Sequence, residues 1–164
     1  QNQEKRNART QYETLDKRLA VFEPQVVVID GQSIEVSAEE KKAYDTAVAL
    51  LQTGKYGDAE KAFKDLNDNF KKSPYRMDAL FWWGTSAFAN EHYKTAISSQ
   101  NQLLREFSKG ARAADAMMLV ASSQAASGSI NAAKATLQKI IKTYPKTDVA
   151  KEAAQRIREF DQKK

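Results

Sequence analysis

The sequence predicts an all-α solenoid built from three stacked helix hairpins, a C-terminal capping helix and a short preceding coiled-coil segment. The first observation is a repeat, because residues of similar size recur twice at a spacing of 37 positions. The second is the composition, since 41% hydrophobic and 29% charged residues suit thin helical repeats with a large surface. The recurring sets are Ala59, Ala96 and Ala133; Ala47, Gly84 and Ala121; Leu66, Leu103 and Ile140; and Phe70, Phe107 and Tyr144. A period of this length is typical of stacked repeats, which present a curved surface to another protein.

Residues 1–23 are expected to form the end of a coiled-coil stem. Tyr12, Leu15, Leu19 and Phe22 follow one another at steps of three, four and three residues, which is the spacing of a coiled-coil seam. The seam covers two heptads at most, and a helix this short is marginal by itself in water. We therefore expect it to continue in a longer chain or to act as a short oligomerising stem.

Residues 24–36 are expected to form a linker. Pro24 ends the preceding helix, because the residue before a proline is disfavoured in helical geometry. Asp30-Gly31 suits a two-residue turn between β-branched residues, which indicates a short hairpin. An isolated hairpin is only marginally stable, so an extended linker is the open alternative.

Residues 37–164 are expected to form the repeat domain. Ser37 and Glu40 have the spacing of a capping box at the start of a helix. This helix is expected to run to about residue 51, with Gly54 supplying the left-handed residue that ends it. Each following pair of helices should repeat the same plan.

The later helix boundaries follow from turn and capping residues. Ser73-Pro74 predicts a new start, with the serine as cap and the proline at the first helical position. Thr147 is expected to cap a last amphipathic helix that covers the end of the stack. The helices between the first helix and the last are expected at about 57–70, 75–90, 93–107, 111–127 and 130–143.

The repeated positions resemble the tetratricopeptide repeat, in which small residues let the two helices of a pair cross closely. The small pairs are Ala47/Ala59, Gly84/Ala96 and Ala121/Ala133, and the large positions are Phe63, Leu66, Trp83, Leu103, Val120, Leu137 and Ile140. Gln100 stands where the other copies have Phe63 and Leu137. The middle repeat is therefore expected to be loosely packed or to carry a buried amide.

Several short stretches resemble the TolA-binding protein family, also called YbgF or cell division coordinator CpoB. They are Leu15-Asp16-Lys17-Arg18-Leu19, Ala43-Tyr44-Asp45-Thr46-Ala47, Phe81-Trp82-Trp83-Gly84, Ala113-Ala114-Asp115-Ala116-Met117 and Tyr144-Pro145-Lys146-Thr147. The resemblance implies the periplasm of a Gram-negative bacterium, a repeat domain that binds TolA of the Tol–Pal system, and a coiled coil that self-associates. It also implies a role in coordinating outer-membrane constriction with septal peptidoglycan synthesis during cell division.

In tetratricopeptide stacks the first helix of each pair lines a concave groove, and its positions here are candidate partner-binding residues. They are Tyr44, Val48, Leu51, Asp78, Phe81, Thr85, Phe88, Asp115, Met118 and Ser122, with Lys41, Gln52, Ala89, Ala125 and Ala126 beside them. Tyr44, Phe81 and Met118 should form one apolar stripe, and Asp78 and Asp115 should offer acceptors at its edge. The alternative is that the linker or the C-terminal helix fills the groove.

The two adjacent tryptophans cannot both face the groove, because neighbouring helical residues point about 100° apart. Trp83 is expected in the core, whereas Trp82 is open between helix packing and the surface. His92 lies in a turn beside Glu91 and is expected to be solvated.

Other functional classes find little support in the sequence. There is no cysteine, phosphate-binding loop, nucleophile elbow or metal-ligand cluster, so we expect no catalysis, cofactor or metal. The net charge of +5 is concentrated in residues 134–164, where bases and acids are mixed as on a solvated helix face, so nucleic acid is not expected. No run of eighteen apolar residues is present, so direct membrane insertion is not expected.

Two alternative functions stay open. One is a tetratricopeptide subunit of outer-membrane protein assembly, although such a subunit normally has a lipidated N-terminal cysteine and five repeats. The other is a cell-wall enzyme, which would need polar groups that converge in a pocket.

Overall fold

The computed structural model of the chain describes residues 2–20 and 23–163, and within the first helix it leaves the side chains of residues 12 and 14–20 undescribed. Helix α1 (Asn2–Ala20) precedes a two-stranded hairpin, β1 (Gln25–Ile29) and β2 (Gln32–Val36). The helices that follow are α2 (Ala38–Gln52), α3 (Tyr56–Asn69), α4 (Arg76–Ala89), α5 (Tyr93–Glu106), α6 (Ala113–Ala126), α7 (Ile130–Thr143) and α8 (Asp148–Gln162).

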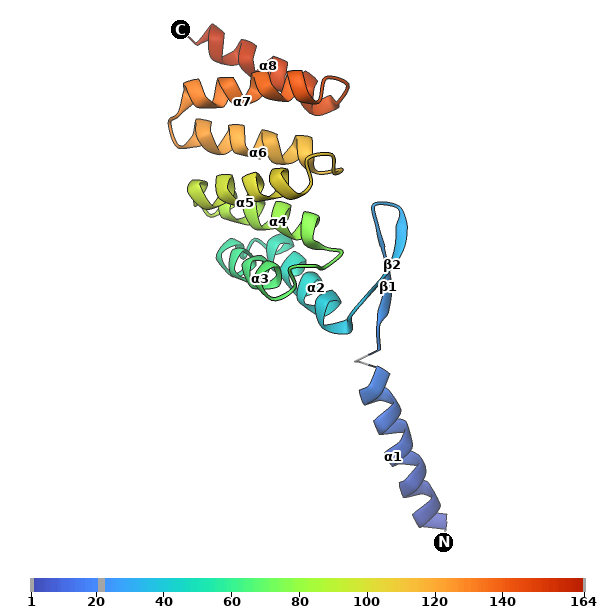
Figure 1. Cartoon of the computed structure of the whole chain (residues 1–164). Coiled ribbons are helices and arrows are strands. Elements are labelled where there is room, and N and C mark those ends of the chain that lie inside the picture. The colour runs from blue at the N-terminus through green and yellow to red at the C-terminus, as the bar shows by residue number, and fades with distance from the viewer. Residues whose placement is uncertain (1, 21–22, 164) are drawn as a thin grey trace.

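Helices α2 to α8 stack in sequence order along one axis, and α1 projects away from the stack (Figure 1). Each helix packs against the next, and α2 also contacts α4, α4 contacts α6, and α6 contacts α8. Alternate helices therefore line the same face of the stack. This confirms the all-α solenoid of three helix hairpins with a C-terminal capping helix. Within the described residues, no helix combines the length and the apolar character needed to cross a membrane.

The expected coiled-coil seam falls on α1. The backbone of residues 2–20 is helical, but the side chains of Tyr12, Leu15 and Leu19 are not described and Phe22 lies outside the described residues. Self-association through this segment therefore stays a prediction.

The linker forms the expected short hairpin and not an extended segment. The strands pair antiparallel from Gln25 opposite Val36 to Ile29 opposite Gln32. Asp30 and Gly31 both have positive φ angles, of 50° and 78°, as a tight two-residue hairpin turn requires. One face of the hairpin packs on the repeats, because Ile29 and Val36 form a buried cluster with Tyr75. This packing stabilises a hairpin that would be marginal by itself.

Two of the expected helix caps are confirmed. The Ser37 hydroxyl accepts a hydrogen bond from the Glu40 amide at 3.1 Å, and the Thr147 hydroxyl accepts one from the Ala150 amide at 3.1 Å. Both residues have the extended backbone of an N-cap.

The start predicted at Ser73-Pro74 is wrong, because α4 begins at Arg76. The Ser73 hydroxyl accepts from the Tyr75 amide at 3.1 Å, and the Ser73 carbonyl accepts from the Arg76 amide at 3.0 Å. These bonds form a turn before the helix, so the serine is not available as its cap. Tyr75 lies within this turn and joins the buried cluster under the hairpin.

The middle repeat carries a buried amide, as one of the two sequence alternatives predicted. Gln100 is 0% exposed, and its Nε2 donates to the carbonyl oxygens of Leu80 at 3.2 Å and Phe81 at 3.1 Å. A Cβ placed on Gly84 would overlap Nε2 of Gln100 and the hydroxyl of Ser99. An alanine on α4 at this position would therefore force the side chains of Gln100 and Ser99 on α5 to move.

We expect Gly84→Ala to lower the free energy of unfolding by about 1–3 kcal/mol, because Gln100 must give up buried hydrogen bonds to make room. This loss outweighs the helix propensity that alanine adds, which is at most about 1 kcal/mol. Urea denaturation followed by circular dichroism measures the change.

Gly57→Ala is the matched control, since a Cβ there would meet only the Asn90 side chain at an ordinary distance of 3.7 Å. It should be neutral or stabilising. Equal stability of the two alanine variants would contradict the tight crossing at Gly84.

Candidate functional site

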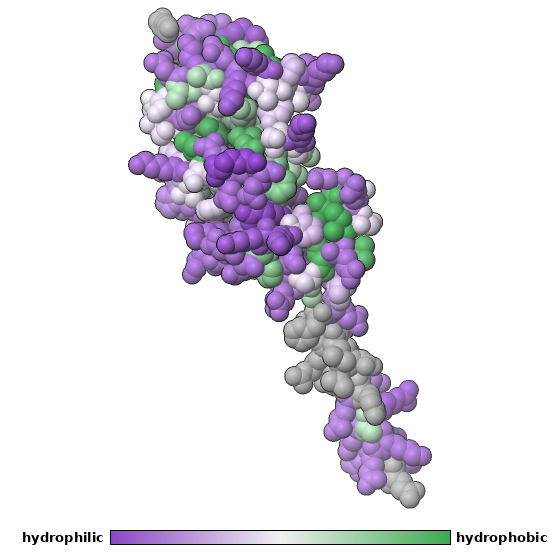
Figure 2. Space-filling view, viewed as in Figure 1, coloured by the Kyte–Doolittle hydropathy of each residue, from purple (hydrophilic) through white to green (hydrophobic). Residues whose placement is uncertain are grey.

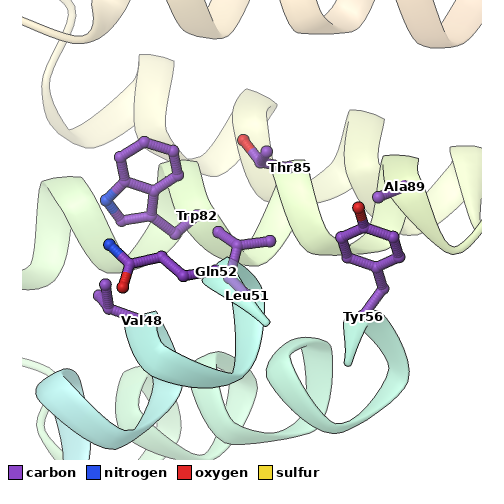
Figure 3. Close-up of a pocket in the computed structure, with 7 residues that line it drawn as sticks. All are labelled: Val48, Leu51, Gln52, Tyr56, Trp82, Thr85 and Ala89. Carbon is purple, nitrogen blue, oxygen red and sulfur yellow. The ribbon is translucent and has the colours of Figure 1, made fainter. Parts of the chain in front are cut away.

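A pocket of about 410 Å³ opens between α2 and α4 (Figure 3). It lies on the face formed by the first helices of the pairs, α2, α4 and α6, which we call the groove face. The pocket is lined by Val48, Leu51, Gln52, Tyr56, Trp82, Thr85 and Ala89. Figure 3 shows these side chains arranged around the space between the two helices. A concave site with apolar walls and few polar groups is typical of ligand and peptide binding.

The pocket brings together part of the expected groove. Val48, Leu51 and Thr85 line it, and so do the neighbouring positions Gln52 and Ala89. The remaining candidates lie elsewhere, in packed contacts of the first repeat, at other positions of α4, or on α6.

Two pocket residues were not among the candidates. Trp82 precedes Thr85 by three residues and Ala89 by seven, so it shares their face of α4. Tyr56 begins α3, and large residues recur at the same repeat position as Tyr93 and Ile130. That recurrence was the available signal for Tyr56, whereas the helical spacing was the signal for Trp82.

Tyr44 is packed between the first repeat and the hairpin. Its ring stacks on Tyr75 with centroids 4.1 Å apart, and it meets Phe63 edge-on at 6.3 Å. Hairpin residues Val27 and Ile34 border the same cluster. The linker thus covers this end of the groove face, as the alternative interpretation expected.

Phe81 and Asp78 are both engaged by Arg112, the residue that precedes α6. The Arg112 guanidinium lies 5.1 Å from the centroid of the Phe81 ring and 5.0 Å from that of Trp82. Its Nε donates to the Asp78 carboxylate at 3.1 Å. Asp78 was expected to offer a free acceptor, and instead it already has a cationic partner. Phe81 also packs on the core cluster of Met77, Leu80, Leu103 and Ala116.

The groove face of the third repeat is partly covered by α8. Met118 is only 8% exposed and belongs to the core cluster that α6 shares with α7 and α8. The Ser122 hydroxyl accepts a hydrogen bond from Arg156 of α8 at 3.0 Å. The stripe expected through Tyr44, Phe81 and Met118 is therefore not continuous on the surface, because the hairpin packs at Tyr44 and the capping helix packs at Met118, as the alternative interpretation expected.

The other candidates are half-buried. Phe88 meets Tyr93 edge-on with ring centroids 5.6 Å apart, so it packs toward the second helix of its own pair. Asp115 is half-buried on α6. Neither residue lines the pocket between α2 and α4.

The two tryptophans divide between core and pocket. The Trp83 ring packs against the core clusters of the first and middle repeats, and its Nε1 is buried. Trp82 packs on the first repeat and lines the pocket. This arrangement agrees with the expectation that at most one of them faces the groove.

His92 is not simply solvated beside Glu91. Its Nδ1 lies 2.9 Å from Oε2 of Glu60 on α3, although 58% of the His92 side chain is exposed. The contact ties the α4–α5 turn to the preceding repeat. Among the described residues, no three His, Cys, Asp or Glu side chains are placed to hold a metal ion.

Burial raises the pKa of Tyr44 to about 12, and the nearby Asp78 carboxylate adds to the rise. The fold therefore favours the neutral phenol, and this stabilisation is fully present below the ordinary pKa of 10.0. It is lost as the pH rises from 10 toward 12.

We expect Tyr44→Phe to lose less stability than the wild type over this range in chemical denaturation experiments. Tyr56→Phe, at an exposed position, should keep the wild-type profile; a Tyr44→Phe profile that matches the wild type would contradict the burial of the phenol.

Three solved structures share the fold. SycD of Yersinia enterocolitica, a type III secretion chaperone in complex with a peptide of the translocator YopD, has a TM-score of 0.61 and 22% identity over 76% of this chain and 90% of that chain. PcrH in complex with the chaperone binding region of PopB has a TM-score of 0.59 and 16% identity over 73% and 91%. The first tetratricopeptide domain of Spaghetti (RPAP3), bound to an HSP90 peptide, has a TM-score of 0.59 and 15% identity over 75% and 90%. These likenesses show the fold.

No curated protein sequence matches the chain. The model of the family YfiO, described as an outer membrane lipoprotein, matches residues 36–163, from the end of the hairpin through the last helix. Since this match spans well over half of the sequence and the whole helical stack, the chain belongs to the YfiO family.

Proposed function

We propose that this chain is a non-enzymatic protein-interaction module of the bacterial cell envelope, which binds a segment of a partner protein on its groove face. The single observation that carries the proposal is the pocket between α2 and α4, whose walls are mostly apolar side chains. Large apolar side chains gathered in a surface hollow are typical of an interaction site. SycD, PcrH and Spaghetti, which share the fold, are each recorded with a peptide or binding region of another protein.

The compartment that we propose is the periplasm. Support comes from the family description, because an outer membrane lipoprotein family belongs to the envelope. The resemblance to the TolA-binding protein family points to the same place.

The partner that we propose is TolA of the Tol–Pal system, with a role in coordinating outer-membrane constriction and septal peptidoglycan synthesis during cell division. The stretches Ala43–Ala47 and Phe81–Gly84 that carry this resemblance lie in α2 and α4, the two helices that form the pocket. Self-association through the seam of α1 belongs to the same proposal, since the resemblance to the TolA-binding protein family implies a coiled coil that self-associates.

A second candidate is a subunit of outer-membrane protein assembly. The match of residues 36–163 to an outer membrane lipoprotein family favours it. Both candidates use the same surface for a protein partner, so they differ in the identity of that partner and not in the type of site.

The test is capture of purified TolA by the wild type and by Ala89→Arg. Ala89 is exposed at the pocket wall, so an arginine there fills the pocket without removing a packed side chain. We expect capture to fall at least about tenfold, since a blocked central pocket removes the main anchor of an interface. This variant is sharper than Phe81→Ala, which would also remove core packing.

Ala132→Arg is the matched control, because Ala132 is exposed on α7, away from the pocket. It should capture TolA as the wild type does, and both variants should keep the helical circular dichroism signal. Unchanged capture by Ala89→Arg would place the contact elsewhere. Absence of TolA capture by the wild type, together with pocket-dependent capture of purified outer-membrane assembly subunits, would favour the second candidate.

A further inference from the structure

Arg112 presents hydrogen-bond donors at one end of the pocket. Its Nε is bound to Asp78, and no partner among the described residues binds its terminal nitrogens, Nη1 and Nη2. The side chain is 33% exposed, whereas that of Asp78 is only 15% exposed. The part of this ion pair that a partner meets is therefore mainly the guanidinium, which can only donate hydrogen bonds.

The guanidinium is held in place before any partner arrives. It lies over the rings of Phe81 and Trp82, and Asp78 fixes its Nε. Phe81 is itself packed on the core cluster of the middle repeat. A side chain that is already ordered loses little conformational entropy on binding, so its hydrogen bonds contribute more to affinity. Arginine, tryptophan and tyrosine are also the residues most enriched among interface hot spots.

The arginine and the pocket are continuous through Trp82. This ring lies under Arg112 and also lines the pocket. Asp78, Trp82, Thr85 and Ala89 follow one another along the same side of α4, and at about 1.5 Å per residue they extend over roughly 16 Å. An extended segment advances about 3.3 Å per residue. A segment of roughly three to five residues can therefore reach Arg112 and the pocket at the same time.

We propose that the partner segment carries a carboxylate that binds Nη1 and Nη2 of Arg112, and a large apolar side chain a few residues away that enters the pocket. This inference rests on the proposed groove binding and deepens it by stating the chemistry of the partner. A carboxylate matches the two parallel donors of a guanidinium edge.

The probe is a library of random linear peptides displayed on phage and selected against the wild-type chain. We expect the enriched peptides to share an acidic residue at a fixed spacing from a large apolar residue. Synthetic peptides in which that Glu or Asp is replaced by Gln or Asn should bind at least about tenfold more weakly to the wild type. With Arg112→Gln, the same replacement in the peptide should change the affinity less than about twofold. With Arg112→Lys, the loss of affinity should lie between those of the wild type and Arg112→Gln.

Arg105→Gln is the matched control, because Arg105 is exposed near the end of α5 and lies outside the pocket. It should keep the wild-type preference for the acidic residue. Two outcomes would overturn the inference and leave groove binding intact. In one, the enriched peptides show no preference for an acidic residue. In the other, the preference persists in Arg112→Gln and Arg112→Lys. Peptides that bind Ala89→Arg as tightly as the wild type would overturn the groove site and the inference together. TolA capture is measured separately and is not needed for either outcome.

Discussion

The close crossing of the two helices within each pair is the contact on which the rest of the structure depends. At the crossing in the first repeat Ala47 and Ala59 are fully buried, and in the middle repeat Gly84 meets the amide of Gln100. A larger residue at any of these positions would separate the helices, and the first helices of successive pairs would no longer contact one another. Because α2 contacts α4 and α4 contacts α6, the groove face exists only while each crossing stays close.

The two ends of the stack are covered by the chain itself. The hairpin packs over Tyr44 and Tyr75, and α8 packs beside α6 and binds Ser122 through Arg156. These contacts bury apolar surface that an unfinished solenoid would expose. The hairpin leaves its own outer face apolar, with Val26 and Val28 exposed by 73% and 72%, and Figure 2 shows an apolar patch in this region. The open pocket thus lies between α2 and α4, where neither cover reaches.

The pocket and the arginine beside it draw their side chains from α2, α3, α4 and the turn before α6. Val48 and Leu51 come from α2, Trp82 comes from α4, and Arg112 comes from the turn before α6. Asp78 and the two aromatic rings hold the arginine, so an apolar hollow and a cationic donor lie side by side. In the proposed interaction, the apolar hollow would take one anchor side chain and the arginine would make one polar contact.

The sequence by itself determined the repeat and the order of the helices, and it narrowed Gln100 to loose packing or a buried amide, between which the structure decided. These features depend on local spacing and on residue size at recurring positions. It also placed Val48, Leu51 and Thr85 on the face that forms the pocket. Only the tertiary structure decided that Tyr44 and Met118 are covered and that Asp78 is bound by Arg112. It also decided that Trp82 lines the pocket, since its helical spacing placed it on the face of Thr85 and Ala89 but left it open between helix packing and the surface. Trp82 has Asp45 and Leu119 at the equivalent repeat positions, so repeat symmetry could not identify it. Contacts such as Asp78–Arg112 and Ser122–Arg156 join residues 34 positions apart, and their geometry is set by how neighbouring repeats pack.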